Sequence, residues 1–270
     1  ARRALDAAGV YGARVTIVHA NLDDVPFSDY FANLIVSEDA LISGEMPAGG
    51  QEALRMLKPL GGTVCIGQPA DAAGKTKPLG KDAMEQWLTE AGMEGGQVVE
   101  EGGVWLTVTR GPLPGVGSWT HQYAGPGNTA CSDDQFIRCP LGLLWYGGPG
   151  PQKMAERHRR AAAPLAIGGR MFIQGEGLGK RIGEAENSVM AYDAYNGMKL
   201  WERSIRGALR VTVTHDAGNS AANADSFFIA VDDTCVRLDA ATGETKHVYK
   251  LPPAGDGQPR SWGYVAVVGD

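Results

Sequence analysis

Cysteine is scarce in the sequence, with four residues among 270, and no two of them form a CxxC or CxxCH arrangement. This argues against zinc-ribbon, thioredoxin-type and c-type haem proteins, which need cysteines in such pairs. Cys131 and Cys139 are near enough in sequence to close a small disulfide loop in an oxidising compartment, and two free buried thiols are the alternative. Histidine is equally sparse, and no metal site is predicted because no metal-ligand spacing occurs among His19, His121, His158, His215 and His247.

Long hydrophobic runs and an excess of basic charge are also missing. No apolar stretch is long enough to span a bilayer, and the N-terminus lacks the charged, apolar and small-residue series of a signal peptide. The formal net charge is −6, which argues against a nucleic-acid or anionic-membrane partner, because both need a clustered basic surface. The dense basic cluster RHRR at 157–160 is interpreted as a solvated loop face.

Glycine, by contrast, is abundant. It supplies 38 of the 270 residues, about twice the usual share, which predicts many tight turns and short strands. The 43% apolar and 21% charged residues are typical of a soluble globular protein. The length suits one large domain or two ordinary ones.

Residues 1–111 alternate between helix and strand patterns. We expect helices over Ala1–Gly12, Gln51–Leu57 and Lys81–Ala91, the last one closed by Gly92. Strand, helix and strand in sequence imply parallel pairing with right-handed crossovers, while the last two strands form a hairpin. The predicted strands are Val15–His19, Ala32–Ser37, Thr63–Gly67, Gln97–Glu101 and Val104–Thr109.

Two segments of residues 1–111 carry the clearest motifs. His19–Ser37 reads HANLDDVPFSDYFANLIVS, and Leu54–Gly62 reads LRMLKPLGG. They resemble segments of the class I S-adenosylmethionine-dependent methyltransferases. The first is similar to that family's Gly-Asp-Ala-x-x-Leu-Pro-Phe turn followed by Phe-Asp-Leu-Val, and the second to its Leu-x-Pro-Gly-Gly turn with Leu60 as one additional residue. The resemblance implies a Rossmann-like domain that binds S-adenosylmethionine.

The resemblance also implies a set of cofactor-binding residues. Asn21 occupies the position where the family places the acid that hydrogen-bonds the adenine amino group, and Leu22 follows it. Asn21 can still accept that bond through its side-chain carbonyl, without the charge. Ser37 and Glu38 stand at the carboxyl end of the next predicted strand, where open α/β sheets place ligands. A carboxylate there can act as a general base, and helix capping or solvation is the alternative.

The family's glycine-rich loop after the first strand, and the acid that ends its second strand, have no counterpart in the sequence. We therefore expect only the C-terminal half of a methyltransferase-like Rossmann domain. A catalytically silent domain kept for packing or assembly is the alternative to an active enzyme. The glycine- and proline-rich run GPLPGVG at 111–117 marks a composition break, which predicts two domains, 1–111 and 112–270.

Residues 112–270 change to short strands separated by glycine or aspartate turns, an antiparallel all-β pattern. An internal repeat runs through them, because MAYDAYNG at Met190–Gly197 returns as VRLDAATG at Val236–Gly243, offset by 46 positions. A period in the forties with about four strands per unit predicts β-propeller blades. The predicted strands are Ala166–Gln174, Val189–Tyr192, Lys199–Ile205, Phe227–Val231, Cys235–Leu238 and Lys246–Leu251.

The repeat resembles the pyrroloquinoline-quinone (PQQ) enzyme-like propellers, whose units carry Leu-x-Ala-Leu-Asp-Ala-x-Thr-Gly-x-x-x-Trp. Met190–Trp201 fits this pattern, whereas the second copy has no tryptophan. Trp119–Trp145 is similar to the entry segment of such domains, and residues 261–270 to the start of a further blade. Two blades do not close a ring of roughly six to eight. The chain is therefore expected to be a fragment, with the remaining propeller blades or another protein chain as its partner.

Quinone dehydrogenases of that kind need an adjacent-cysteine disulfide, a stacked tryptophan, a calcium or lanthanide carboxylate site and a catalytic aspartate. The sequence has no Cys-Cys pair, and turns account for Asp193 and Asp239, so PQQ is not expected as a cofactor. The predicted fold is a multidomain chain, α/β followed by all-β. Three functions remain open: a methyltransferase whose propeller recruits a substrate or partner, a non-catalytic envelope scaffold, and a quinoprotein oxidoreductase. The resemblance to exported propellers favours the periplasm or cell envelope over the cytoplasm.

Overall fold

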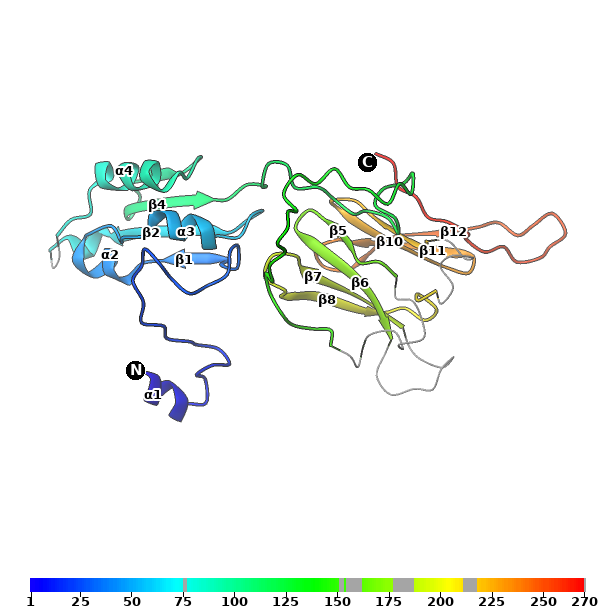
Figure 1. Ribbon diagram of the computed structural model, residues 1–270, viewed down its shortest axis with the longest axis horizontal. Coiled ribbons are helices and arrows are strands. Elements are labelled where there is room, and N and C mark those ends of the chain that lie inside the picture. Colours follow the sequence, from blue (N-terminus) through cyan, green and yellow to red (C-terminus); the bar gives the residue numbers. More distant parts are fainter. Residues whose placement is uncertain (75–76, 151–152, 154–161, 177–186, 211–217, 270) are drawn as a thin grey trace. The chain divides into compact units, whose positions relative to one another are not determined.

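The computed structural model of the chain describes residues 1–74, 77–150, 153, 162–176, 187–210 and 218–269. The chain divides into two compact units, Ala1–Arg110 (unit 1) and Gly111–Asp270 (unit 2), each with a hydrophobic core of its own. Unit 1 combines helices with one sheet, and unit 2 contains strands joined by loops (Figure 1). The predicted basic cluster at 157–160 and His215 lie outside the described residues.

Unit 1 contains a four-stranded sheet in the order β1-β2-β4-β3. β1 and β2 are parallel, and β4 lies antiparallel to both β2 and β3. The predicted parallel pair and the predicted terminal hairpin are confirmed, while the position of β4 between β2 and β3 is not visible in the sequence pattern. The strands span Leu34–Val36 (β1), Thr63–Pro69 (β2), Gln97–Val99 (β3) and Gly103–Thr109 (β4).

The helices of unit 1 supply much of its core. α4 has the predicted bounds because Met84, Trp87 and Leu88 form its buried stripe and Gly92, with φ of 68°, ends it. Leu57, Val64 and Leu106 are among the fully enclosed side chains that the helices and the sheet share. The helices span Arg2–Ala7 (α1), Glu38–Ser43 (α2), Gly50–Met56 (α3) and Lys81–Ala91 (α4), with a 3₁₀ turn at Ala70–Gly74 (η1).

Two predictions near the N-terminus are wrong. The strand predicted over Val15–His19 does not form: Val15 makes only an isolated bridge to Tyr11, and Val15 and Val18 are exposed. The helix predicted over Ala1–Gly12 is limited to α1, which buries none of its residues. A short helix or strand is marginal in water without packing against a partner, so the local pattern neither extends α1 to Gly12 nor forms the strand.

Unit 2 contains two four-stranded antiparallel sheets: sheet I in the order β5-β6-β7-β8 and sheet II in the order β12-β11-β10-β9. The predicted hairpins are confirmed, but Ala166–Gln174 is two strands joined by a turn at Gly168 and Gly169, and β9 has no counterpart among the predictions. The described residues of unit 2 form these two sheets and no closed ring of sheets. Sheet I comprises Leu165–Ile167 (β5), Arg170–Glu176 (β6), Asn187–Asp193 (β7) and Lys199–Ser204 (β8); sheet II comprises Ser220–Ala222 (β9), Ser226–Val231 (β10), Thr234–Asp239 (β11) and Thr245–Lys250 (β12).

The two repeated turns have the same hydrogen bonds in sheets I and II. Asp193 Oδ1 accepts the backbone N–H groups of Tyr195 and Asn196, at 3.0 and 3.3 Å. Asp239 Oδ1 accepts the corresponding pair of N–H groups in sheet II, at 2.9 and 3.0 Å. Gly197 and Gly243 close the two turns with φ of 71° and 74°, in the left-handed region that favours glycine.

Each repeated turn also receives a tryptophan from the preceding part of the chain. Trp145 Nε1 donates to the carbonyl of Ala194 at 2.9 Å, and Trp201 Nε1 donates to the carbonyl of Ala240 at 3.0 Å. The indole of Trp201 therefore links sheet I to sheet II, beside an aromatic cluster in which Phe172 and Phe227 have ring centroids 5.0 Å apart. A side chain at Gly243 would meet this indole, since its Cβ would lie 2.7 Å from Trp201 Cδ2.

Candidate functional site

A cavity of about 280 Å³ opens at the carboxyl end of β1, and we call it the β1 cavity. Its wall is predominantly apolar and includes Leu22, Val25, Ile35, Met56 and Ile66. Ser37, Glu38 and Asp39 border it where β1 passes into α2. The carboxyl edge of a parallel pair is where α/β sheets place their ligands, so this cavity is the candidate site of unit 1.

Arg55 on α3 holds the loop that forms one side of the β1 cavity. Its guanidinium pairs with both carboxylate oxygens of Glu52, at 2.7 and 2.8 Å, and with Asp29 at 2.8 Å. It also donates to the backbone carbonyls of Val25 and Phe27, at 3.1 and 2.7 Å. These contacts join residues 25–29 to α3 and thereby position the Leu22–Val25 wall.

The hydrogen bonds of this cluster also shift its ionisation. The bond from Arg55, with a smaller contribution from the N–H of Val25, holds the pKa of Glu52 below its usual range, against the opposing effect of burial. The bonds to Glu52 and Asp29 raise the pKa of Arg55. Glu52 and Arg55 are therefore both charged at neutral pH. They form a fixed ion pair and do not exchange protons with a substrate.

A close backbone approach completes the wall. Gly49 has φ of 76°, and a Cβ there would lie 2.1 Å from the carbonyl oxygen of Leu22. Trp87 Nε1 donates to the carbonyl of Pro47 at 2.8 Å and fixes the same stretch from the other side. The position of Leu22 therefore depends on a glycine 27 positions away.

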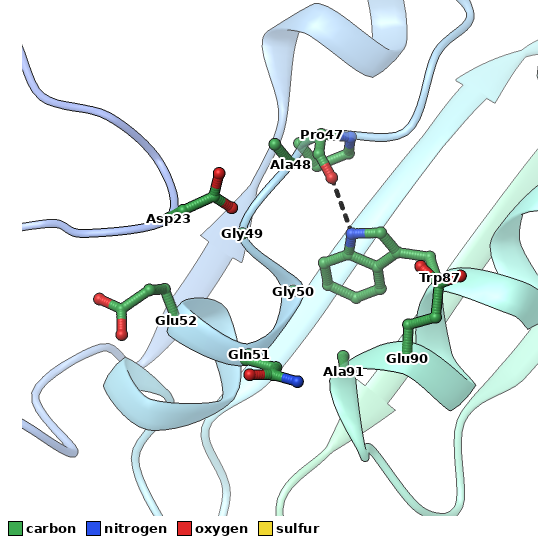
Figure 2. Close-up of a pocket in the computed structure, with 10 residues that line it drawn as sticks. All are labelled: Asp23, Pro47, Ala48, Gly49, Gly50, Gln51, Glu52, Trp87, Glu90 and Ala91. Atoms are coloured by element: carbon green, nitrogen blue, oxygen red, sulfur yellow. Dashed lines mark hydrogen bonds between the residues drawn. The ribbon is translucent and has the colours of Figure 1, made fainter.

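Beyond residues 47–49 lies a second cavity of about 340 Å³, bordered by the same Trp87. Figure 2 shows the carboxylates of Asp23 and Glu52 on one side of it and the indole of Trp87 with Glu90 on the other. Glu52 is already paired with Arg55, and Glu90 accepts a hydrogen bond from Gln86 at 2.7 Å. This cavity borders the candidate site but contains none of the four residues predicted from the sequence.

The structure brings three of the four predicted site residues to the β1 cavity. Leu22, Ser37 and Glu38 line it, whereas Asn21 is exposed and is not among its lining residues. Asn21 Oδ1 accepts the N–H of Asp23 at 3.2 Å, within the turn. Ser37 is the N-cap of α2, with Oγ accepting the N–H of Ala40 at 3.1 Å. Helix capping was the alternative predicted for the carboxylates here, and the side chain that caps α2 is instead that of Ser37.

Sequence reasoning missed Arg55, Gly49 and Trp87. One local signal was available, because Glu52 and Arg55 stand three positions apart on a predicted helix, where opposite charges meet. The approach of Gly49 to Leu22 and the bond from Trp87 to Pro47 join distant positions and have no local signal.

S-adenosylmethionine can be tested against this geometry. The apolar walls suit a flat adenine ring, and Glu38 offers one carboxylate at the rim. The volume is slightly below the ~300 Å³ at which small-molecule sites begin, so the β1 cavity fits the adenine-bearing part of the cofactor and not the whole of it. The oxygens of Asn21 and Ser37 already accept one backbone N–H each, and each retains a second lone pair.

Comparison with known proteins gives only distant structural likenesses. No protein-family model and no curated protein matches the chain. Among solved structures, a europium-containing methanol dehydrogenase aligns with 57% of the chain at 21% identity and a TM-score of 0.35. A protein of Methanococcus maripaludis assigned as an S-adenosyl-L-methionine-dependent methyltransferase aligns with 41% at 18% identity and a TM-score of 0.31. A quinohemoprotein alcohol dehydrogenase of Pseudomonas putida HK5 aligns with 52% at 18% identity and a TM-score of 0.34.

The chain spans 26%, 61% and 20% of these three structures, respectively. The structural likeness is loosely to the two kinds of protein that the sequence resembles. Within the described residues, no group of three or more histidine, cysteine or carboxylate side chains is arranged to hold a metal ion. None of the helices there has the length and apolar character needed to cross a membrane. All four cysteines are free, with Cys131 and Cys139 exposed.

Proposed function

We propose that unit 1 binds S-adenosylmethionine through the β1 cavity, as the C-terminal half of a methyltransferase-like Rossmann domain, and that sheets I and II are propeller blades that recruit a substrate or partner. The observation that carries this proposal is the convergence of Leu22, Ser37 and Glu38 on one cavity at the carboxyl end of β1. The cofactor supplies an electrophilic methyl group when it is bound.

The chain's own residues have defined roles in this proposal. Leu22 and Ile35 enclose the adenine ring, which removes apolar surface from water. The Arg55 cluster keeps the Leu22 wall in place. Glu38, exposed at the rim, accepts the proton of the methyl acceptor as a general base.

The test is calorimetric titration of the full chain with S-adenosylmethionine. We expect saturable heat for the unaltered protein and at least about tenfold weaker binding for Leu22→Glu, because a carboxylate in the apolar wall costs more than ~1.4 kcal/mol. Ile42→Glu is the matched control: Ile42 is 59% exposed in the same unit and lines neither cavity, so its variant should bind like the unaltered protein. Absence of heat at donor concentrations up to millimolar removes the proposal.

A non-catalytic scaffold, placed at the periplasm or cell envelope, is the second candidate function. It is favoured by the outer strand of sheet II, since β12 forms one edge of that sheet and all six of its residues are exposed. An open edge of this kind is a template for pairing with another strand. Cell fractionation tests the location, and titration with PQQ and calcium tests the third candidate, a quinoprotein oxidoreductase.

A further inference from the structure

One face of sheet II carries a cavity that the proposed function does not use. The register places Arg237 opposite Phe228 on β10, and Cys235 opposite Tyr249 on β12, so these four side chains share a face. The cavity between them has a volume of about 270 Å³, and we call it the Arg237 cavity. Its other lining residues are Asn223, Trp262, Val265, Ala266 and Val267.

The opposite wall of the Arg237 cavity is a segment held at several points. Trp262 donates to the carbonyls of Asp232 and Asp233, at 2.8 Å through its backbone and 3.2 Å through its indole. Val265 donates to the carbonyl of Gly218 at 3.0 Å, and Val267 to His121 Nε2 at 3.0 Å. The wall is therefore fixed on both sides of the space it encloses, which favours a preformed site.

Arg237 presents unused hydrogen-bond donors to this space. Its Nε donates to Ser226 Oγ at 2.8 Å, and its Cζ lies 5.6 Å from the ring centroid of Phe228, so the guanidinium plane is held in place. Within the described part of the chain, neither terminal nitrogen has an acceptor, and these nitrogens form the fork that binds a carboxylate with two parallel bonds.

The other lining residues determine which chemical group can be attached to a carboxylate bound by Arg237. The lining contains no acidic side chain, and burial raises the pKa of the Cys235 thiol to about 11, so that group adds no negative charge at neutral pH. Phe228, Tyr249 and Trp262 contribute aromatic surface suited to a flat ring. The volume of about 270 Å³ lies below the ~300 Å³ at which drug-sized ligand sites begin, which limits the occupant to a smaller molecule.

We propose that the Arg237 cavity is a binding site for a small aromatic carboxylate, with the carboxylate on the terminal nitrogens of Arg237 and the ring against Tyr249 and Trp262. The site lies wholly within unit 2 and does not depend on methyl-donor binding in unit 1. Inorganic phosphate meets only the charge requirement, and a neutral aromatic amide meets only the ring requirement. Phosphate therefore tests the contribution of the charge to binding, and the amide tests the contribution of the ring.

Ligand-observed NMR titration of the full chain with phenylacetate tests this site. A ligand of this size is expected to bind with a dissociation constant on the order of 1 mM. Phenylacetamide and inorganic phosphate should each bind at least about tenfold more weakly, because each loses either the charge-assisted pair or the aromatic contact. Equal binding of phosphate and phenylacetate would overturn the aromatic part of the proposal.

Arg237→Gln should weaken phenylacetate binding by about tenfold or more, since it removes the fork and the charge. Arg206→Gln is the matched control, because Arg206 is an exposed arginine of the same unit outside the cavity. A circular-dichroism melt of each variant separates a binding loss from a folding loss. Arg237→Lys keeps the charge without the fork and should restore only part of the affinity. Unchanged binding in a folded Arg237→Gln variant, or no saturation by the unaltered chain at about 10 mM, refutes the site.

Discussion

At the scale of single residues, Gly243 has two independent reasons to lack a side chain. Its φ is 74°, and an added Cβ would meet the Trp201 indole that donates to Ala240. Gly243→Ala should therefore lower the free energy of unfolding by about 2–4 kcal/mol, combining left-handed backbone strain with overpacking. Gly255→Ala is the control, because nothing lies within 4 Å of that position, and it should change stability by less than ~0.5 kcal/mol. Urea unfolding followed by far-UV circular dichroism compares the two, and equal effects would contradict the tryptophan contact.

At the scale of elements, a buried histidine accepts one of the hydrogen bonds that hold residues 262–267 in place. His121 Nε2 accepts the N–H of Val267 at 3.0 Å, so in the neutral ring Nδ1 carries the proton toward Thr120 Oγ1, 2.7 Å away. Protonation of Nε2 abolishes the bond to Val267, and burial lowers the pKa of His121 from its usual 6.5.

The sign of the resulting pH dependence follows from proton uptake. The unfolded chain protonates His121 at a higher pH than the folded chain. The contribution of neutral His121 to the free energy of unfolding is therefore complete above pH 6.5 and is lost as the pH falls through the folded-state pKa. Unfolding measured between pH 7 and pH 5 should show this decline (roughly the histidine window). The decline should be smaller in His121→Gln and unchanged in the exposed control His247→Gln. An identical pH profile for all three proteins would show that His121 does not titrate on unfolding.

At the scale of the whole molecule, the two units have separate cores. Leu57 is fully buried in the core of unit 1, and Ile229 is fully buried in that of unit 2. Truncation of either to alanine removes buried contacts worth about 2–5 kcal/mol. We expect calorimetry of the full chain to show two transitions, with Leu57→Ala lowering the temperature of one and Ile229→Ala that of the other. A single transition moved by both substitutions would show that the cores unfold together.

The parts of this architecture that the sequence predicts are those with local causes. The stripe that ends at Gly92 specifies α4, and the repeated Asp and Gly at 193/197 and 239/243 specify two hairpin turns. The parts it does not predict depend on register and distance. The approach of Gly49 to Leu22 and the placement of Arg237 across from Phe228 are set by strand pairing and loop packing, which no short window of sequence contains. The prediction of a strand at Val15–His19 is wrong because a strand also needs a neighbouring strand to pair with, and this segment has only the isolated bridge between Tyr11 and Val15.

The contact between tryptophan and turn has a direction. Trp145 and Trp201 both donate to a carbonyl that lies later in the chain, so the Met190–Trp201 copy accepts one such bond at Ala194 and donates the next one through Trp201, whereas the Val236–Gly243 copy only accepts. A tandem duplication of the Met190–Trp201 copy brings an indole donor and a carbonyl acceptor together, whereas a duplication of the Val236–Gly243 copy brings an acceptor alone. A gene that repeats the Met190–Trp201 copy can therefore lengthen in whole-period steps and keep the tryptophan-to-carbonyl bond at each new junction.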